Sequence, residues 1–270
     1  MATLVCFHAH PDDESIATAG TMAKTAAAGH RVVLVVATRG EHGEPVPGVL
    51  EADEPLGLRR VAETYRSAEV LGAARVEFLG YVDSGMVGTP TAEAPWAFCQ
   101  ADVDHAAHRL AAILDEERPE VLTTYDDNGG YGHPDHIGVH RVGRRAAELA
   151  GVEHVFESTI NRDHIMRLMA ERRARGDLSE ADLANGPNLE EAPDFGKPEA
   201  VITHCVDATE FVAQKRASMR LHRSQMADDH FLLGMPDEAF ALGLGVEWYI
   251  AAGPAPPDGS LAAELFQPIR

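Results

Sequence analysis

The stretch from Leu4 to Glu14 reads LVCFHAHPDDE, an apolar run that ends abruptly in histidines and acidic residues. An alanine-rich segment with helical periodicity follows it. The pattern predicts a buried strand that delivers polar side chains to its carboxyl end, the edge at which open α/β sheets place their ligands. A second stretch, from Val121 to His136, reads VLTTYDDNGGYGHPDH and repeats this order. We expect the two clusters to meet and to form one metal site.

The chain has 270 residues, of which 43 are acidic and 23 are Lys or Arg, so its formal net charge is −20. This excess of acid argues against binding to nucleic acid or to an anionic membrane, because both need clustered basic residues. The three cysteines stand apart, which is typical of a reduced cytoplasmic protein. We find no secretion signal and no membrane-spanning run, and we expect a cytoplasmic protein. The sequence leaves open whether it forms a homo-oligomer.

Apolar, β-branched runs alternate with amphipathic segments along the chain. Strands are expected near residues 3–9, 31–38, 75–80, 120–125, 152–158, 200–206 and 246–250. Helices are expected near residues 14–28, 57–72, 101–117, 134–150, 161–175 and 208–224, with an irregular segment at 225–245. The order strand, helix, strand predicts right-handed crossovers and a mostly parallel sheet. The fold class is therefore α/β, with a smaller C-terminal elaboration.

We interpret residues 1–270 as one domain, with a core at about 1–160 and a C-terminal part at 200–252. The polar segment 176–198 is expected to be a surface excursion, because a strand resumes after it. The Gly/Pro/acid-rich segment 39–56 leaves the carboxyl end of the second strand. We expect that segment to form a wall of the site.

A hydrolytic zinc site needs about three protein ligands and a position for water. His10 and Asp13 stand three residues apart across a strand-to-helix turn and can face one point, and His136 can supply the third ligand. Two histidines and a carboxylate suit Zn²⁺, and also Fe²⁺ or another divalent metal. Such a metal lowers the pKa of its water and polarises a carbonyl oxygen.

Other residues of the two clusters can carry the rest of a hydrolytic reaction. Asp12, adjacent to a ligand, is the candidate general base. Asp135 can orient His133, which can then act as an acid or as a hydrogen-bond donor to an oxyanion. Tyr131 lies on a glycine-flanked loop and can donate to the same oxyanion.

Simpler interpretations exist for several of these features. A single His-Pro-Asp after a strand also suits helix capping, but two copies at two strand ends make capping a poor explanation. His8 is expected to pack against or support the site rather than to bind metal. On the residues alone, Asp83 suits a turn, Arg60 an exposed helix position and His222 a solvated helix face.

Segments 10–14 and 133–136 resemble the paired signature of the LmbE/PIG-L family of zinc-dependent N-deacetylases. The likeness extends to segments 126–132 and 82–86, which are similar to the actinobacterial mycothiol-pathway deacetylase and S-conjugate amidase branch. It implies a Rossmann-like fold with helices on both faces of the sheet. It also implies that Arg60 and Asp83 contact substrate hydroxyls. The site residues that the resemblance implies are the zinc ligands His10, Asp13 and His136, the base Asp12, the oxyanion donors His133 and Tyr131, and Asp135, which tunes His133.

Residues and resemblance together predict a hydrolase that removes the acetyl group of a 2-acetamido sugar or its conjugate, a small N-acylated partner. The resemblance implies a lysine at about position 17 in the amidase branch and a serine in the deacetylase branch, and this chain has Ala17 there. Cleavage of a mycothiol-type S-conjugate and deacylation of a natural-product glycoside are therefore alternatives. A sugar-binding protein without turnover and a non-haem iron oxygenase are rivals from other classes, and the intact base beside the ligands favours hydrolysis over both.

Overall fold

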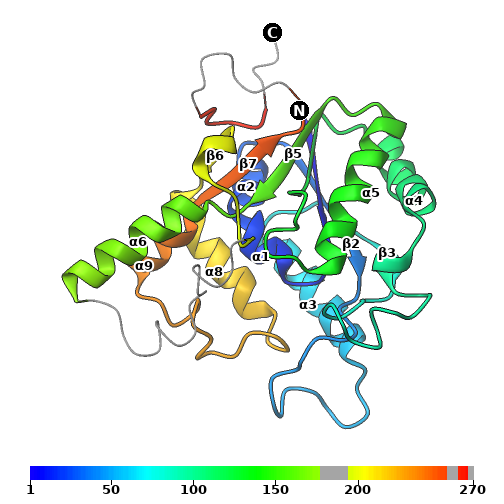
Figure 1. Cartoon of the computed structure of the whole chain (residues 1–270), viewed down its shortest axis with the longest axis horizontal. Coiled ribbons are helices and arrows are strands. Elements are labelled where there is room, and N and C mark those ends of the chain that lie inside the picture. Colours follow the sequence, from blue (N-terminus) through cyan, green and yellow to red (C-terminus); the bar gives the residue numbers. More distant parts are fainter. Residues whose placement is uncertain (177–193, 254–260, 267–270) are drawn as a thin grey trace.

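The computed structural model describes residues 1–176, 194–253 and 261–266 (Figure 1). Within these residues the strands form one seven-stranded sheet in the order β3-β2-β1-β4-β5-β7-β6. The strands are β1 (Thr3–His8), β2 (Arg31–Thr38), β3 (Arg75–Tyr81), β4 (Val121–Tyr125), β5 (His154–Thr159), β6 (His204–Asp207) and β7 (Val246–Ala251). Strands β1 to β5 are parallel, whereas β7 pairs antiparallel with both β5 and β6. The expected mostly parallel α/β sheet is confirmed.

The described helices are α1 (Asp13–Ala17), α2 (Ala19–Ala27), α3 (Leu56–Val70), α4 (Val103–Glu117), α5 (Pro134–Ala150), α6 (Arg162–Arg175), α8 (Val212–Leu221) and α9 (Asp237–Leu244). The single helix expected near 14–28 is wrong, because Thr18 leaves the helical backbone and its hydroxyl bonds the His8 ring at 2.8 Å. The irregular segment expected at 225–245 contains α9. The strand expected at 200–206 begins only at His204, after a 3₁₀ turn at Glu199–Val201.

Alternate residues of the central strand β1 feed two separate cores. Val5 and Phe7 pack with residues of α4 and α5 on one face of the sheet. Leu4 and Cys6 pack with residues of α2 and α3 on the other face. Because helices cover both faces, the central strands are continuously apolar rather than alternating. Figure 1 shows α4 and α5 together on one side of the sheet, and the expected helices on both faces are confirmed.

The C-terminal part extends the same sheet and packs back onto α2. Glu247 of β7 is 3% exposed and accepts hydrogen bonds from the backbone N–H groups of Gly20 and Thr21, each at 2.8 Å. Lys215 of α8 donates to the same carboxylate at 2.7 Å. A carboxylate at the amino end of a helix is stabilised by the free N–H groups and by the helix dipole. This network ties α8 and β7 to α2.

Most of the expected surface excursion at 176–198 lies outside the described residues. Its last residues, 194–197, run beside the loop that follows β4, where the Gly196 N–H donates to the carbonyl of Gly130 at 2.7 Å. Across the described ranges, no helix is both long and apolar enough to cross a membrane.

The turn from β1 into α1 holds Asp12 at a φ of 101° and a ψ of −25°. A non-glycine residue with positive φ costs of order 1–3 kcal/mol and persists only when its surroundings enforce it. Here the Asp12 carbonyl accepts two hydrogen bonds from Ser15, one from the backbone N–H at 3.0 Å and one from the hydroxyl at 2.7 Å. The chain thus keeps strain at the residue that the sequence singles out as a base.

Replacement of Glu247 by alanine is expected to lower the free energy of unfolding by about 3–5 kcal/mol, because Lys215 would become a buried unpaired charge. Lys215→Met should cost less, since the α2 backbone and the Thr21 hydroxyl still donate to the carboxylate. Urea unfolding of both variants measures the difference. Equal losses would contradict the central place of Glu247 in this network.

Asp12→Gly is expected to be more stable than Asp12→Ala by about 1 kcal/mol, because glycine adopts a positive φ without a Cβ clash. Thermal and urea unfolding of the two variants provide the comparison. An alanine variant as stable as the glycine variant would mean that the turn relaxes to negative φ once the carboxylate is gone.

Candidate metal centre and active site

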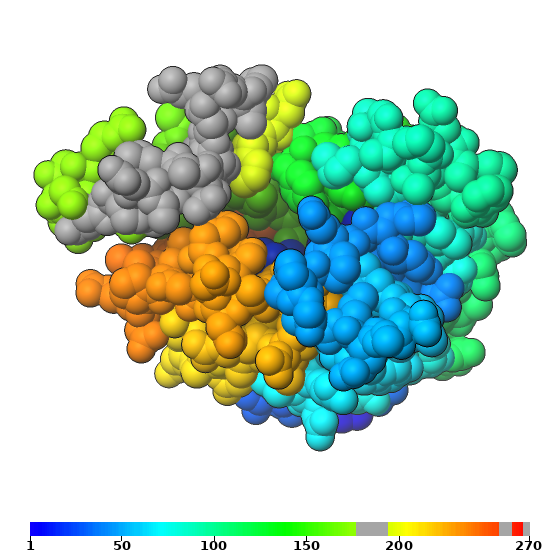
Figure 2. Space-filling model, turned by 90° about the horizontal axis from the view of Figure 1, so that it is seen from below, coloured from blue at the N-terminus to red at the C-terminus, as the bar shows by residue number. Residues whose placement is uncertain are grey.

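The carboxyl ends of β1 and β4 lie side by side because these strands are direct neighbours in the sheet. Each strand is followed by one of the two His-Pro-Asp segments, and the rings of His10 and His133 lie 4.7 Å apart. Figure 2 shows a hollow at this edge, between the blue segment after β2 and the orange segment before β7, with dark blue atoms of the N-terminal part on its floor. The two clusters meet as expected.

The Asp13 carboxylate lies between the two histidines expected to be ligands. One of its oxygens is 3.6 Å from His10 Nδ1 and the other is 3.4 Å from His136 Nε2. Burial alone would raise the pKa of Asp13, but His136 and His10 hold it well below its usual range. The carboxylate is therefore ionised, the form that a metal needs.

The ring of His136 is held so that one nitrogen is free to bind a cation. Its Nδ1 donates to the carbonyl of Gly129 at 3.0 Å, so the neutral ring carries its lone pair on Nε2. That Nε2 is buried without a hydrogen-bond partner among the described residues. Gly129 makes the contact possible, because it has a φ of 61° and a Cβ there would lie 2.3 Å from that of His136.

His10 is oriented by carboxylates on its other side. Its Nε2 donates to Asp135 at 3.1 Å and lies 3.4 Å from Asp83, which leaves Nδ1 directed at Asp13. Asp135 in turn accepts the backbone N–H of Ser84 at 2.9 Å and the Ser84 hydroxyl. A carboxylate behind a histidine is the usual support of a metal-binding imidazole.

His133 has a different hydrogen-bonding state from the other two rings. Its Nδ1 accepts the backbone N–H of Asp135 at 3.1 Å, so the neutral ring carries its proton on Nε2. Burial, with the nearby His10 and His136, lowers the pKa of His133 to about 4. The expectation that the Asp135 carboxylate bonds His133 is corrected by these contacts, because that carboxylate is engaged with His10 and Ser84 and only the Asp135 backbone reaches His133.

Two sets of three side chains in the described residues have candidate ligand atoms within 4.8 Å of one another: His10, His133 and His136, and His10, Asp83 and Asp135. Neither set contains Asp13, which bridges His10 and His136. The proton on His133 Nε2 and the engagement of Asp83 and Asp135 with His10 argue against these three as ligands. The chemistry of the donor set therefore favours His10, Asp13 and His136.

Asp12 lies beside this centre and is paired with Arg60. The Arg60 Nη2 donates to Asp12 Oδ1 at 3.2 Å and its Nη1 donates to the carbonyl of Gly40 at 2.9 Å. Burial raises the pKa of the Asp12 carboxyl, Arg60 opposes this and Asp13 reinforces it. A raised carboxyl pKa suits a general base that must also release its proton.

Tyr131 lies on the loop between β4 and α5, and its side chain is 47% exposed. Its ring centre is 5.0 Å from that of His136. Desolvation and the carboxylates of Asp13 and Asp12 raise the pKa of Tyr131, so the phenol keeps its proton. The buried Asp126 fixes this loop by accepting the backbone N–H groups of Asn128 and Gly130, each at 3.0 Å.

The two expected substrate-binding residues are turned toward the protein. Arg60 is 4% exposed, so the exposed helix position that its local sequence suggested is wrong. Asp83 is also 4% exposed, and it accepts the backbone N–H groups of His42 at 3.1 Å and Gly85 at 2.8 Å. The first residues of the segment 39–56 therefore lie against both side chains.

The structure adds residues to the site that the sequence did not reveal. His222 is fully buried and bonds Glu14 at 2.6 Å, so the solvated face suggested for it is wrong. His8 bonds the Tyr125 hydroxyl at 2.7 Å and Thr18, and its expected supporting place is confirmed. The sequence contained only a weak indication of the burial of His222. A histidine at helical spacing has the same local pattern whether it faces water or a distant acidic residue.

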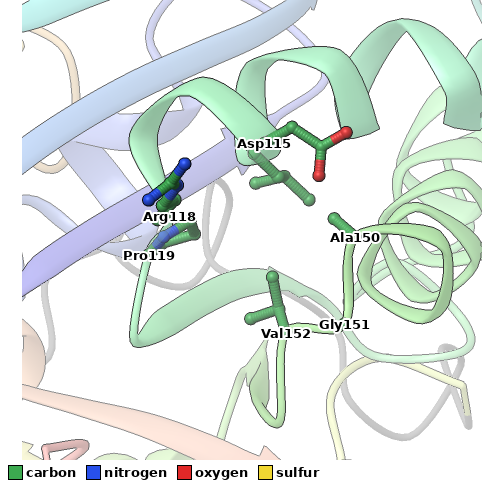
Figure 3. Close-up of a pocket in the computed structure, with 7 residues that line it drawn as sticks. Asp115, Arg118, Pro119, Ala150, Gly151 and Val152 are labelled. Carbon is green, nitrogen blue, oxygen red and sulfur yellow. The ribbon is translucent and has the colours of Figure 1, made fainter.

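A second hollow lies at the opposite edge of the sheet, where α4 and α5 end (Figure 3). It is lined by Leu114, Asp115, Arg118, Pro119, Ala150, Gly151 and Val152. None of the candidate catalytic or metal-binding residues lies there. The candidate residues of the two clusters lie at the carboxyl edge of the sheet and not in this second hollow.

A family model described as GlcNAc-PI de-N-acetylase (PIG-L) matches residues 5–147. The chain is 42% identical over 269 residues to the 1D-myo-inositol 2-acetamido-2-deoxy-alpha-D-glucopyranoside deacetylase of Acidothermus cellulolyticus, covering 95% of this chain and 91% of that protein. It is 39% identical over 282 residues to the protein of the same name from Thermobifida fusca, covering 95% and 96%.

Among solved structures, the chain is similar to the 4-carboxy-2-hydroxymuconate hydratase GalB of Pseudomonas putida, with a TM-score of 0.61 and 18% identity over 94% of this chain and 97% of that chain. At this identity the likeness concerns the fold alone. The family match and the two relatives cover both clusters and confirm the resemblance seen in the two His-Pro-Asp segments. The chain belongs to the GlcNAc-PI de-N-acetylase (PIG-L) family.

Proposed function

We propose that this chain is a zinc-dependent N-deacetylase that removes the acetyl group from the 2-acetamido sugar of an inositol glycoside. The observation that carries the proposal is the position of Asp12, a partly buried carboxyl group with a raised pKa directly beside the Asp13, His10 and His136 cluster. The named activity of two relatives that align with 95% of this chain supports the choice of substrate.

We assign the metal to His10, Asp13 and His136. The fit rests on the unpartnered, buried Nε2 of His136 and on the ionised carboxylate of Asp13 that faces both rings. Two histidines and one carboxylate form a set that Zn²⁺ binds well, with room for water. When bound, the ion would supply a Lewis acid that lowers the pKa of a water molecule and polarises the acetyl carbonyl.

Asp12 takes the role of general base in this proposal. It accepts the proton that water loses as the water oxygen adds to the acetyl carbon. Asp12 then returns this proton to the nitrogen as the C–N bond breaks, so that the products are acetate and the free amine. Arg60 keeps the base in place through its hydrogen bond to Asp12 Oδ1.

Two neutral donors on the other cluster would stabilise the oxyanion of the addition step. The His133 ring carries its proton on Nε2, and the Tyr131 phenol is protonated at neutral pH, as an ordinary phenol is, with its pKa shifted further upward. Donors that are fixed before reaction lower the barrier without reorganising during it. We propose that Asp135 acts on this site through His10 and Ser84, and that any substrate contact of Arg60 or Asp83 is secondary to their protein contacts.

The expected activity is acetate release from the inositol glycoside of N-acetylglucosamine by zinc-loaded protein. A panel with free N-acetylglucosamine and an N-acetylcysteinyl conjugate tests the choice of substrate. Asp12→Ala should lower kcat by at least about a hundredfold, because it removes the general base. Undiminished turnover by that variant would contradict the role of Asp12. Cleavage of the conjugate alone would assign the chain to amidase chemistry.

Alanine at His10, Asp13 or His136 is expected to abolish tight zinc binding, because each change removes one of three ligands. His133→Ala should keep its zinc, since His133 Nδ1 accepts the Asp135 backbone N–H and Nε2 carries a proton, so that neither nitrogen is free to bind metal. The variant should lose activity, because it lacks the proposed donor to the oxyanion. Metal content after dialysis, measured by mass spectrometry, distinguishes the four variants. Zinc loss from His133→Ala together with zinc retention by Asp13→Ala would contradict this assignment and make His133, not Asp13, a ligand.

A further inference from the structure

A buried carboxylate lies directly behind the proposed base. Glu14 has no exposed surface, and its Oε2 accepts the backbone N–H of Asp12 at 3.0 Å. Its Oε1 accepts the Ser67 hydroxyl of α3 and the Nε2–H of His222, each at 2.6 Å. The Asp12 backbone, helix α3 and the end of α8 therefore meet at one carboxylate.

This contact bears on the strained backbone of Asp12. The bond from the Asp12 N–H and the bonds from Ser15 to the Asp12 carbonyl fix the peptide groups on both sides of the residue with positive φ. Rotation of either peptide would carry the Asp12 carboxylate away from the metal cluster. The direction of the base thus depends on Glu14 keeping its own orientation.

His222 is the partner that reaches Glu14 from the far end of the chain, 208 residues away. Its ring has no exposed surface, and its Nδ1 has no hydrogen-bond partner in the described part of the chain. An unsatisfied buried ring nitrogen costs roughly 1–3 kcal/mol. An apolar side chain of similar size would avoid that cost, but it would leave the buried Glu14 carboxylate without its donor from the C-terminal part of the chain.

We propose that the His222–Glu14 pair is a positioning device for the general base, through which the C-terminal part of the chain sets the orientation of Asp12. This inference rests on the proposed function for the role of Asp12. His222 itself does not touch the substrate, because it is enclosed on all sides.

The same turn of chain offers a matched structural contact. Ser224 is also fully buried, and it donates to Glu63 of α3 through its backbone N–H at 3.0 Å and its hydroxyl at 2.6 Å. Within the described residues, the Glu63 carboxylate bonds Ser224 and makes no hydrogen bond to Asp12. If this segment served only to dock the C-terminal part, loss of the Ser224 hydroxyl and loss of the His222 ring would have the same kind of effect.

The test compares His222→Leu, His222→Gln and Ser224→Ala in the full-length, zinc-loaded protein. Leucine removes the donor to Glu14, whereas glutamine keeps an N–H donor that can reach the same carboxylate. We expect His222→Leu to lower kcat by about 10–100-fold with KM changed less than about twofold, because a misdirected base slows the chemical step. His222→Gln should recover most of the rate, and Ser224→Ala should keep the wild-type rate.

Hydrogen exchange of the Asp12 amide, followed by NMR, gives a readout that does not need turnover. Exchange should be faster in His222→Leu, near normal in His222→Gln and unchanged in Ser224→Ala. Wild-type protein that releases no acetate from any panel member would refute the proposed function, while this exchange pattern would still support the positioning contact. If His222→Leu does not fold, Glu14→Gln tests the contact from the other side, with a slower kcat and faster Asp12 exchange as the supporting result.

Two outcomes would overturn the inference. One is a His222→Leu variant whose kcat and Asp12 exchange match those of Ser224→Ala. The other is a slower kcat with an unchanged Asp12 amide, because the effect would then reach the site by a route other than Glu14.

Discussion

Three carboxylates surround the ring of His10, the buried Asp83 and Asp135 and the partly buried Asp13, and the site is built around this concentration of charge. Burial alone would lower the pKa of the metal-free His10 ring, but its contacts with the carboxylates of Asp13, Asp135 and Asp83 hold that pKa well above its usual range. The three acids come from α1, the start of α5 and the segment after β3. Because buried carboxylates are tolerated only with partners, the contacts of this one ring hold three separate parts of the chain together.

The strain at Asp12 shows how the remaining structure serves the site. A residue with positive φ is kept where an unstrained turn would have been more stable. The Asp12 N–H donates to Glu14, and Ser15 and Arg60 donate to Asp12, and these bonds enforce the conformation. Strain of this kind is found where function requires a side chain in a particular direction. Helix α8 also supports this turn, because His222 at its end reaches Glu14 only when α8 is packed against the rest of the protein.

The fold does not by itself decide the reaction. The chain shares its fold with a protein named as a hydratase, at a TM-score of 0.61, and one fold can host different chemistry. In this chain the hydrolytic assignment depends on protonation states that neighbours impose. His136 has a free Nε2 because its Nδ1–H donates to the Gly129 carbonyl. His133 keeps a proton on Nε2 because its Nδ1 accepts the backbone N–H of Asp135.

The sequence by itself determined the parallel sheet and the meeting of the two His-Pro-Asp segments, which follow from local periodicity and from the rule that parallel strands end at one edge. The helices on both faces were implied by the resemblance of the two segments to a known family. Only the tertiary structure decided the partners of Asp135, the burial of Arg60 and the contact of His222 with Glu14. Hydrogen bonds between side chains up to 208 residues apart leave no local pattern, because they depend on how elements pack rather than on which residues are neighbours in the chain.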